Sequence, residues 1–177
     1  MENLFQNTAT IREFSWSNLG DIRDGRADLG EEMPVFLYRS MQFALLDVLT
    51  KELGADKADE CFRKAGFLAG TEFAKQMLDL GLEMNKFLSH LSDALADYKI
   101  GILHMEAFDP DTGNLVLTVG QDLDCSGLPI TNETACRYDE GFFSGIFNIY
   151  TGKEYIVREI DCWASGGRVC RFDAQAC

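Results

Sequence analysis

The stretch CRYDEGFFSGIFNIYTGKEYIVREIDCWASGGRVCRFDA, residues 136–174, decides the fold because its apolar period changes partway along. Its first part, from about residue 134 to residue 150, has the period of an amphipathic helix, and Gly152 follows as a stop signal. Two strand-like segments, 154–164 and 169–174, then flank the turn sequence SGGR. The stretch therefore predicts one helix followed by a β-hairpin.

The residues before this stretch predict further helices and a second hairpin. Pro34 suits the first turn of a helix and Gly54 its end. The sequence DPDTG carries Pro and Gly, which favour a turn between two alternating segments. The expected helices cover residues 33–54, 56–80 and 84–98, and the expected strands cover 99–108 and 114–121.

The order of these elements is helices, hairpin, helix, hairpin. Because no strand–helix–strand alternation occurs, the order predicts an α+β fold in which helices pack on an antiparallel sheet built from two hairpins. Residues 31–177 are expected to form a single domain. Residues 1–30 are polar, contain three glycines and are interpreted as an N-terminal arm.

The chain is strongly acidic. Among 177 residues, 16 are Lys or Arg and 29 are Asp or Glu, which gives a formal net charge of -13. This charge repels phosphate backbones and anionic lipids, so direct binding of nucleic acid is not expected. No apolar run reaches the roughly 20 residues of a membrane-spanning helix. The beginning of the chain does not resemble a secretory signal peptide, so the expected location is cytoplasmic, without membrane insertion.

The six cysteines favour metal binding or reduced thiols over disulfides, because the chain is large and shows no export signal. Cys162 and Cys170 flank the last predicted turn, and Cys136 lies on the inward face of the preceding helix. Together with Glu159 they could surround a tetrahedral zinc ion. Strict alternation places Glu159 and Cys162 on opposite faces of the strand, so this set requires a bulge or a strand end. Three buried, reduced thiols remain the alternative, since the spacing is not that of a standard zinc finger.

The stretch CFRKAGFLAG, residues 61–70, repeats the spacing of CRYDEGFFSG, which begins the opening stretch. On its helix, Gly66 and Gly70 lie in the middle of the apolar stripe, where they would allow another backbone to approach closely. The matching Gly141 and Gly145 are placed at the margin of their apolar face. The two helices therefore show different faces, and Cys61 is not expected to bind metal.

The C-terminal half resembles the 4-vinyl reductase domain family. The matching pattern is a Cys, a Gly-aromatic-x-x-Gly segment and a final E-x-x-C-x-x-x-G-x-x-x-C-x-F segment, and the similarity extends over roughly residues 33–174. These positions are Cys136, Gly141, Gly145, Glu159, Cys162, Gly166, Cys170 and Phe172.

This resemblance implies a fold similar to the TRAPP transport-particle subunits and often a homodimer. It also implies a relationship to the sensor domains of phenol-responsive transcription activators, in which three Cys and one Glu hold zinc beside a closed pocket for a small aromatic molecule. Matched by position, the implied zinc ligands are Cys136, Glu159, Cys162 and Cys170. The zinc is expected to be structural, since four protein ligands leave no open position.

The leading interpretation is a zinc-stapled binding or sensor domain for a small hydrophobic or aromatic molecule, acting in regulation or carriage, with a regulatory partner protein as its output. The sequence VFLYRSMQFALL is a candidate homodimer surface. One alternative is a reductase or accessory factor for tetrapyrrole vinyl groups, and another is a dimeric scaffold without a ligand. Catalysis is not favoured, since the chain has no dinucleotide fingerprint, no phosphate-binding loop and no evident nucleophile and base, and no catalytic residues are predicted.

Apolar side chains on the predicted helices and strands are candidates for lining a ligand pocket. Such pockets are mostly apolar with a few polar anchors, and His104 could be one anchor. The alternatives are ordinary core packing for the apolar residues and, for His104, a solvent-facing position beside Glu106. The candidates are Phe67, Phe73, Met77, Phe87, Leu91, His104, Met105, Phe142, Phe147 and Trp163.

Overall fold

The computed structural model describes residues 13–177. The chain divides into two compact units, residues 1–34 and residues 35–177. Within the described part of the first unit, a short 3-10 helix, η1, covers Trp16–Leu19, and one helical turn, α1, covers Ile22–Gly25. The carboxylate of Asp21 accepts a hydrogen bond from the backbone N–H of Asp24 and caps that turn.

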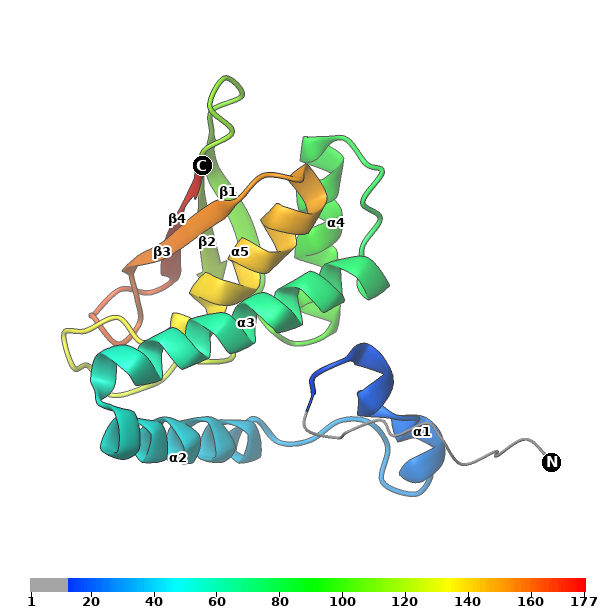
Figure 1. The fold of residues 1–177 in the computed structure, drawn as a ribbon, viewed down its shortest axis with the longest axis vertical. Helices are drawn as coiled ribbons and strands as arrows, with labels where there is room; N and C mark the ends of the chain where they lie inside the picture. The colour runs from blue at the N-terminus through cyan, green and yellow to red at the C-terminus, as the bar shows by residue number, and fades with distance from the viewer. Residues whose placement is uncertain (1–12) are drawn as a thin grey trace. The chain divides into compact units, whose positions relative to one another are not determined.

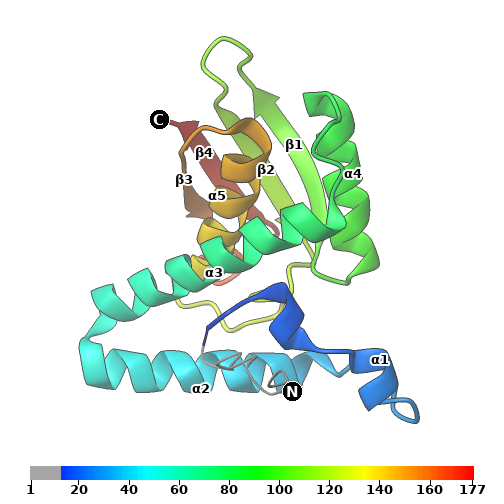
Figure 2. The ribbon, with the colours of Figure 1, turned by 45° about the vertical axis from the view of Figure 1, so that its right-hand side comes forward.

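Four helices belong to the second unit: α2 (Val35–Leu53), α3 (Ala55–Met77), α4 (Met84–Asp97) and α5 (Arg137–Thr151). Gly54, with φ +86°, reverses the chain between α2 and α3, and Figures 1 and 2 show these two helices as an antiparallel pair. This backbone conformation favours glycine, which explains the stop signal in the sequence.

The sheet contains β1 (Ile102–Phe108), β2 (Leu115–Gly120), β3 (Tyr155–Asp161) and β4 (Cys170–Ala176). Its strand order is β1-β2-β4-β3 and every pair is antiparallel. The two predicted hairpins therefore join side by side through β2 and β4 (Figure 2). The predicted α+β class and the predicted order of elements are both confirmed.

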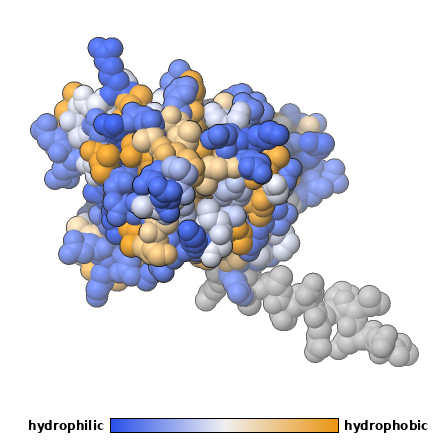
Figure 3. All heavy atoms as spheres, turned by 90° about the horizontal axis from the view of Figure 1, so that it is seen from above, coloured by the Kyte–Doolittle hydropathy of each residue, from blue (hydrophilic) through white to orange (hydrophobic). Residues whose placement is uncertain are grey.

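The core lies between the sheet and α5, with α4 beside them. Alternate residues of β4 point inward and are buried, including Phe172. Its ring meets that of Phe143 on α5, with ring centroids 5.2 Å apart. Phe87 of α4 stacks on Tyr150 at the end of α5, at 3.7 Å. On the face shown in Figure 3, hydrophilic side chains lie between hydrophobic ones, as is usual for globular proteins.

The two similar stretches of the sequence pack against each other as parts of α3 and α5. A Cβ atom at Gly66 would overlap the carbonyl oxygen of Tyr138, and one at Gly141 would overlap the carbonyl oxygen of Arg63. Gly70 and Gly145 contact the opposite backbone in the same way. Because both contacts advance together along the two helices, the helices run in the same direction at backbone contact.

The close-packing role predicted for the α3 glycines is confirmed. The placement of Gly141 and Gly145 at the margin of an apolar face was wrong, since both are buried against α3.

Candidate metal centre

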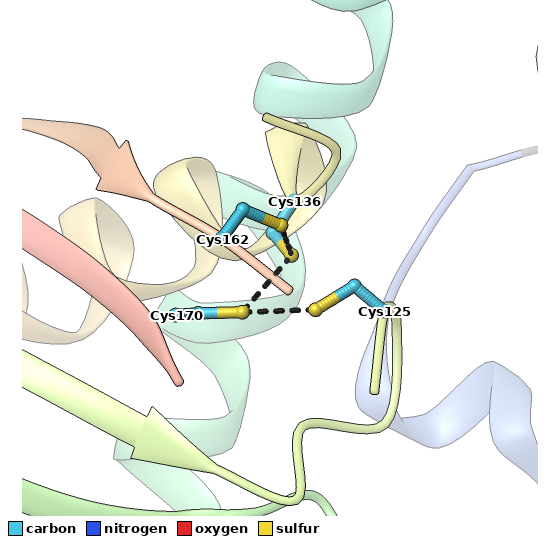
Figure 4. Close-up of side chains that lie close together, drawn as sticks. All are labelled: Cys125, Cys136, Cys162 and Cys170. Atoms are coloured by element: carbon cyan, nitrogen blue, oxygen red, sulfur yellow. Dashed lines mark hydrogen bonds between the residues drawn. The ribbon is translucent and has the colours of Figure 1, made fainter. Parts of the chain in front are cut away.

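Four cysteine sulfur atoms converge at one end of the sheet (Figure 4). Cys125 comes from the loop after β2, and Cys136 immediately precedes α5. Cys162 follows the end of β3, and Cys170 is the first residue of β4. All four side chains are fully buried, and their sulfur atoms all lie within 4.8 Å of one another. Two loops, a helix start and a strand start are thus brought to one point.

The spacing of the sulfur atoms fits a tetrahedral metal ion. Zinc–thiolate bonds of about 2.3 Å with tetrahedral angles separate neighbouring sulfur atoms by roughly 3.8 Å. Cys136 lies 3.6 Å from Cys170 and 3.9 Å from Cys162, measured between Sγ atoms. The Cys125 and Cys170 Sγ atoms are closer, at 2.9 Å. Four buried thiols in this arrangement are compatible with metal binding.

Three of the four predicted ligands therefore come together, and Cys125 joins them. Glu159 lies beside the cluster: its Oε2 accepts a hydrogen bond of 2.8 Å from the backbone N–H of Cys136. Its Oε1 is buried and has no hydrogen-bond partner in the described structure. The pairing of β3 with β4 shifts between Glu159 and Asp161, which is the irregularity that the predicted ligand set required. The predicted role of Glu159 as a ligand stays a prediction.

The sequence analysis missed Cys125. It stands in the irregular segment QDLDCSGLPITNETA, residues 121–135, where no periodicity predicts the direction of a side chain. The one available signal was the presence of a further cysteine after the end of a predicted strand.

Buried carboxyl groups surround the cysteines. Burial raises the pKa of Asp122 to about 6 and the pKa of Glu159 to about 8. Burial also raises the pKa values of Asp124 and Asp139. Each of these groups would lose solvation on ionising, and a nearby cation would offset that cost. The set of acidic donors is therefore suited to a positively charged guest.

The thiols also influence one another. Hydrogen bonding among them, with Cys125 as the largest contributor, lowers the pKa of Cys162 and raises the pKa values of Cys136 and Cys170. In the metal-free cluster, Cys162 therefore takes the role of the thiolate that accepts hydrogen bonds from its neighbours. A thiolate is the form that binds metal.

The loop that carries Cys125 is held by the first turns of α2. The Tyr38 hydroxyl donates a hydrogen bond of 2.8 Å to Oδ1 of Asp124. Arg39 donates to the carbonyl oxygens of Leu123, at 2.7 Å, and Ser126, at 3.0 Å. The position of Cys125 is thus linked to α2.

The residues predicted to line a ligand pocket do not gather around one cavity. Most belong to the packed core, where Phe87, Leu91 and Phe147 are fully buried. Others, including His104 and Met105, face solvent from β1. The buried members are Phe73, Phe87, Leu91, Phe142 and Phe147; the exposed members are Phe67, His104 and Met105; Met77 and Trp163 are half-buried. Which residues contact a ligand stays a prediction.

An apolar pocket of about 330 Å³ lies between α2 and α3. Its walls are mostly aliphatic and aromatic, and three polar side chains contribute to its lining. One of these, Gln42, has a buried Oε1 without a hydrogen-bond partner in the described structure. The lining residues are Tyr38, Met41, Gln42, Leu45, Leu49, Cys61, Phe62, Ala65 and Tyr138.

The C-terminal part of the chain now has a recognisable identity. Residues 115–176 match the 4-vinyl reductase domain. This confirms the predicted resemblance, and the matched segment carries all four cysteines of the metal centre. The chain is 28% identical over 149 residues to an uncharacterized protein of Methanocaldococcus jannaschii, covering 84% of this chain and 81% of the relative. A second uncharacterized protein of that organism is 19% identical over 144 residues, covering 81% of this chain and 76% of the relative.

Solved structures share the fold at low sequence identity. The phenol-responsive sensory domain of the transcription activator PoxR, with phenol, is 20% identical, with a TM-score of 0.65 over 84% of this chain and 79% of its own. A vinyl-4-reductase family protein from Methanocaldococcus jannaschii is 11% identical, with a TM-score of 0.59 over 84% and 85%. A trafficking protein particle complex subunit 3 from Naegleria fowleri, covalently bound to palmitic acid, is 9% identical, with a TM-score of 0.64 over 81% and 94%.

These likenesses establish the fold. Within residues 13–177, no helix combines the length and the apolar character needed to cross a membrane.

Proposed function

We propose that this chain is a binding or sensor domain for a small hydrophobic or aromatic molecule, with a structural zinc ion in its C-terminal part. The pocket between α2 and α3 is the observation that carries the ligand proposal. It is largely apolar, and Gln42 Oε1 offers a buried acceptor to a ligand hydroxyl. The phenol named with the similar PoxR sensory domain belongs to the same chemical class.

The proposed zinc ligands are Cys136, Cys162 and Cys170, with Cys125 as the fourth. The ion would join the loop after β2, the start of α5 and both ends of the last hairpin. Closed four-thiolate sites are structural, so zinc would contribute folding free energy rather than chemistry. Glu159 is the alternative fourth ligand implied by the resemblance.

Calorimetric titration with p-cresol tests the ligand proposal. The wild-type chain should bind p-cresol, and Gln42→Leu should bind it several-fold more weakly because one hydrogen bond is worth about 0.5–1.5 kcal/mol. Toluene, which lacks the hydroxyl, should bind both proteins equally. Gln76→Leu, an exposed change elsewhere on α3, is the matched control and should bind like wild type. Absence of p-cresol binding by the zinc-loaded wild type would refute the proposal.

We also infer a homodimer through α2. No residue of this helix is fully buried, and apolar side chains such as Phe36, Phe43 and Val48 are exposed. A contiguous apolar face of this kind marks an interaction surface. Light scattering after size-exclusion chromatography should show twice the monomer mass for wild type and for the control Lys57→Glu. The double variant Phe43→Glu and Val48→Glu should show the monomer mass, and a monomeric wild type would contradict the inference.

A further inference from the structure

All four strands have one end at the same edge of the sheet. β1 and β4 begin there, since Ile102 pairs with Gly120 and Cys170 pairs with Val119. β2 and β3 end there. The segments that flank these ends come from four distant parts of the sequence, and they meet next to the first turn of α2.

A cleft of about 450 Å³ opens at this edge. Three cationic side chains line it: Arg39 from α2, Lys99 before β1 and Arg168 before β4. Within residues 13–177, none of the three has a carboxylate within ion-pair distance. The chain as a whole has a formal net charge of -13, so three unpaired cations in one cleft run against its average charge.

Two side chains of the cleft are fixed by hydrogen bonds to the backbone. Arg39 donates only to carbonyl oxygens, including that of Leu123, so its charge is not neutralised by these contacts. The Trp163 ring lines the cleft and its Nε1 donates to the carbonyl oxygen of Leu128 at 3.0 Å. A positive charge and a flat ring are therefore both held in place before a ligand arrives.

Asp122 is the acidic side chain in the lining, and it is turned inward. It is 3% exposed, and its Oδ1 accepts hydrogen bonds from the backbone N–H groups of Asp124 and Cys125. These bonds are 2.8 Å and 3.1 Å long. Its carboxylate thus organises the loop beneath the cleft.

The backbone of the cleft is held in an uncommon conformation. Lys99 has φ 61° and Gln121 has φ 52°, and both line the cleft. Left-handed conformations at residues other than glycine are costly, by on the order of 1 kcal/mol, and they gather at ligand sites. The surrounding structure therefore maintains two strained residues at the rim of the same cleft.

We propose that this cleft binds a small organic anion that carries a planar ring, an aromatic carboxylate in its simplest form. Lys99 and Arg168 would contact the carboxylate, and Trp163 would contact the ring. Charge-assisted hydrogen bonds to a carboxylate are about twice as strong as neutral ones. None of these residues lines the pocket between α2 and α3, so this site does not depend on the ligand proposed there.

Calorimetry with sodium benzoate tests the site, with Trp163 fluorescence as a second readout in a Trp16→Phe background. Benzoate should bind wild type saturably and more weakly as salt rises. Arg168→Gln and Lys99→Gln should each weaken benzoate binding roughly tenfold, since a hydrogen bond to a charged group is worth about 1.5–3 kcal/mol. Lys153→Gln, an exposed lysine outside the cleft, should bind benzoate like wild type.

Three results would overturn the proposal: no benzoate binding to folded, zinc-loaded wild type, binding unchanged in both cleft variants, or benzyl alcohol binding as tightly as benzoate. Inorganic phosphate binding as tightly as benzoate would refute the ring preference. Because p-cresol binding depends on Gln42 and benzoate binding on Arg168, failure of one proposal is distinguishable from failure of the other.

Discussion

Gly66 and Tyr138 lie in backbone contact, with the Tyr138 carbonyl oxygen at the position that a Cβ at residue 66 would occupy. Gly141 has the same relationship with Arg63, so the contact is reciprocal. Four glycines thus allow α3 to lie directly on α5, the helix that begins immediately after Cys136. The distance between these helices determines where Cys136 enters the metal centre.

Gly66→Ala should destabilise the protein, because the added methyl group forces the two helices apart. Overpacking of this kind costs about 1–3 kcal/mol, occasionally more. For a chain of this length, the midpoint of thermal unfolding should fall by several degrees. Gly120→Ala is the control: its Cβ would meet Val169 at 3.8 Å, an ordinary contact. Equal melting temperatures for the two variants would contradict the close packing of α3 on α5.

The fold was predictable because its strongest signals are local. Two turn sequences between alternating segments predict two hairpins, and both occur. The face of α5 was harder to predict: Gly141 and Gly145 have no side chain, so apolar counts around a helical wheel say little about what they contact. Periodicity predicted three members of the cysteine cluster from a helix and a hairpin. It could not predict Cys125, whose position depends on hydrogen bonds from α2 to a non-repetitive loop.

Cys125→Ser should lower zinc affinity more than Glu159→Gln does. The sulfur of Cys125 belongs to the four-sulfur cluster, whereas Glu159 accepts a hydrogen bond from the backbone of Cys136. Zinc content after dialysis against a graded chelator series measures the difference, and Cys61→Ser serves as the control outside the cluster. If Glu159→Gln loses zinc while Cys125→Ser keeps it, the ligand set is the one implied by the family resemblance.

Cys162→Ser should lose stoichiometric zinc and lower the melting temperature. Removing one thiolate leaves an incomplete site, and the zinc-dependent part of the folding free energy is lost with the ion. Metal analysis and thermal denaturation of the same preparation give both readouts. An unchanged melting temperature in a protein that contains no zinc as wild type would remove the structural role proposed for the metal.

The metal-free protein should become less stable as pH rises from about 4 to about 8. Burial raises the pKa of Asp122 from 3.8 to about 6 and that of Glu159 from 4.5 to about 8. Between the unfolded and folded pKa values the folded state holds more protons, so the free energy of unfolding decreases with pH. Denaturant unfolding in the presence of a chelator measures this slope.

Asp122→Asn should flatten the slope, because it removes one buried group that must ionise, while the exposed change Asp97→Asn should leave it unchanged. Zinc should reverse the trend, since its ligands bind in deprotonated form and its affinity therefore rises with pH. A metal-free protein whose stability rises over this range would show that the carboxyl groups are not held in buried, poorly solvated positions.

Tyr38→Phe should loosen the loop that carries Cys125. The lost hydroxyl leaves Asp124 Oδ1 without its 2.8 Å hydrogen bond, and Oδ2 of the same buried carboxyl already has no partner in the described structure. An unsatisfied buried acceptor costs about 1–3 kcal/mol, more when it is charged. The Tyr38 hydrogen bond also lowers the pKa of Asp124, so its loss should raise that pKa and destabilise the variant most at high pH. Zinc release to a chromophoric chelator should be faster than in wild type. Tyr98→Phe alters an exposed hydroxyl and should match wild type in both measurements. Equal zinc release by Tyr38→Phe and Tyr98→Phe would show that α2 does not hold the Cys125 loop in solution.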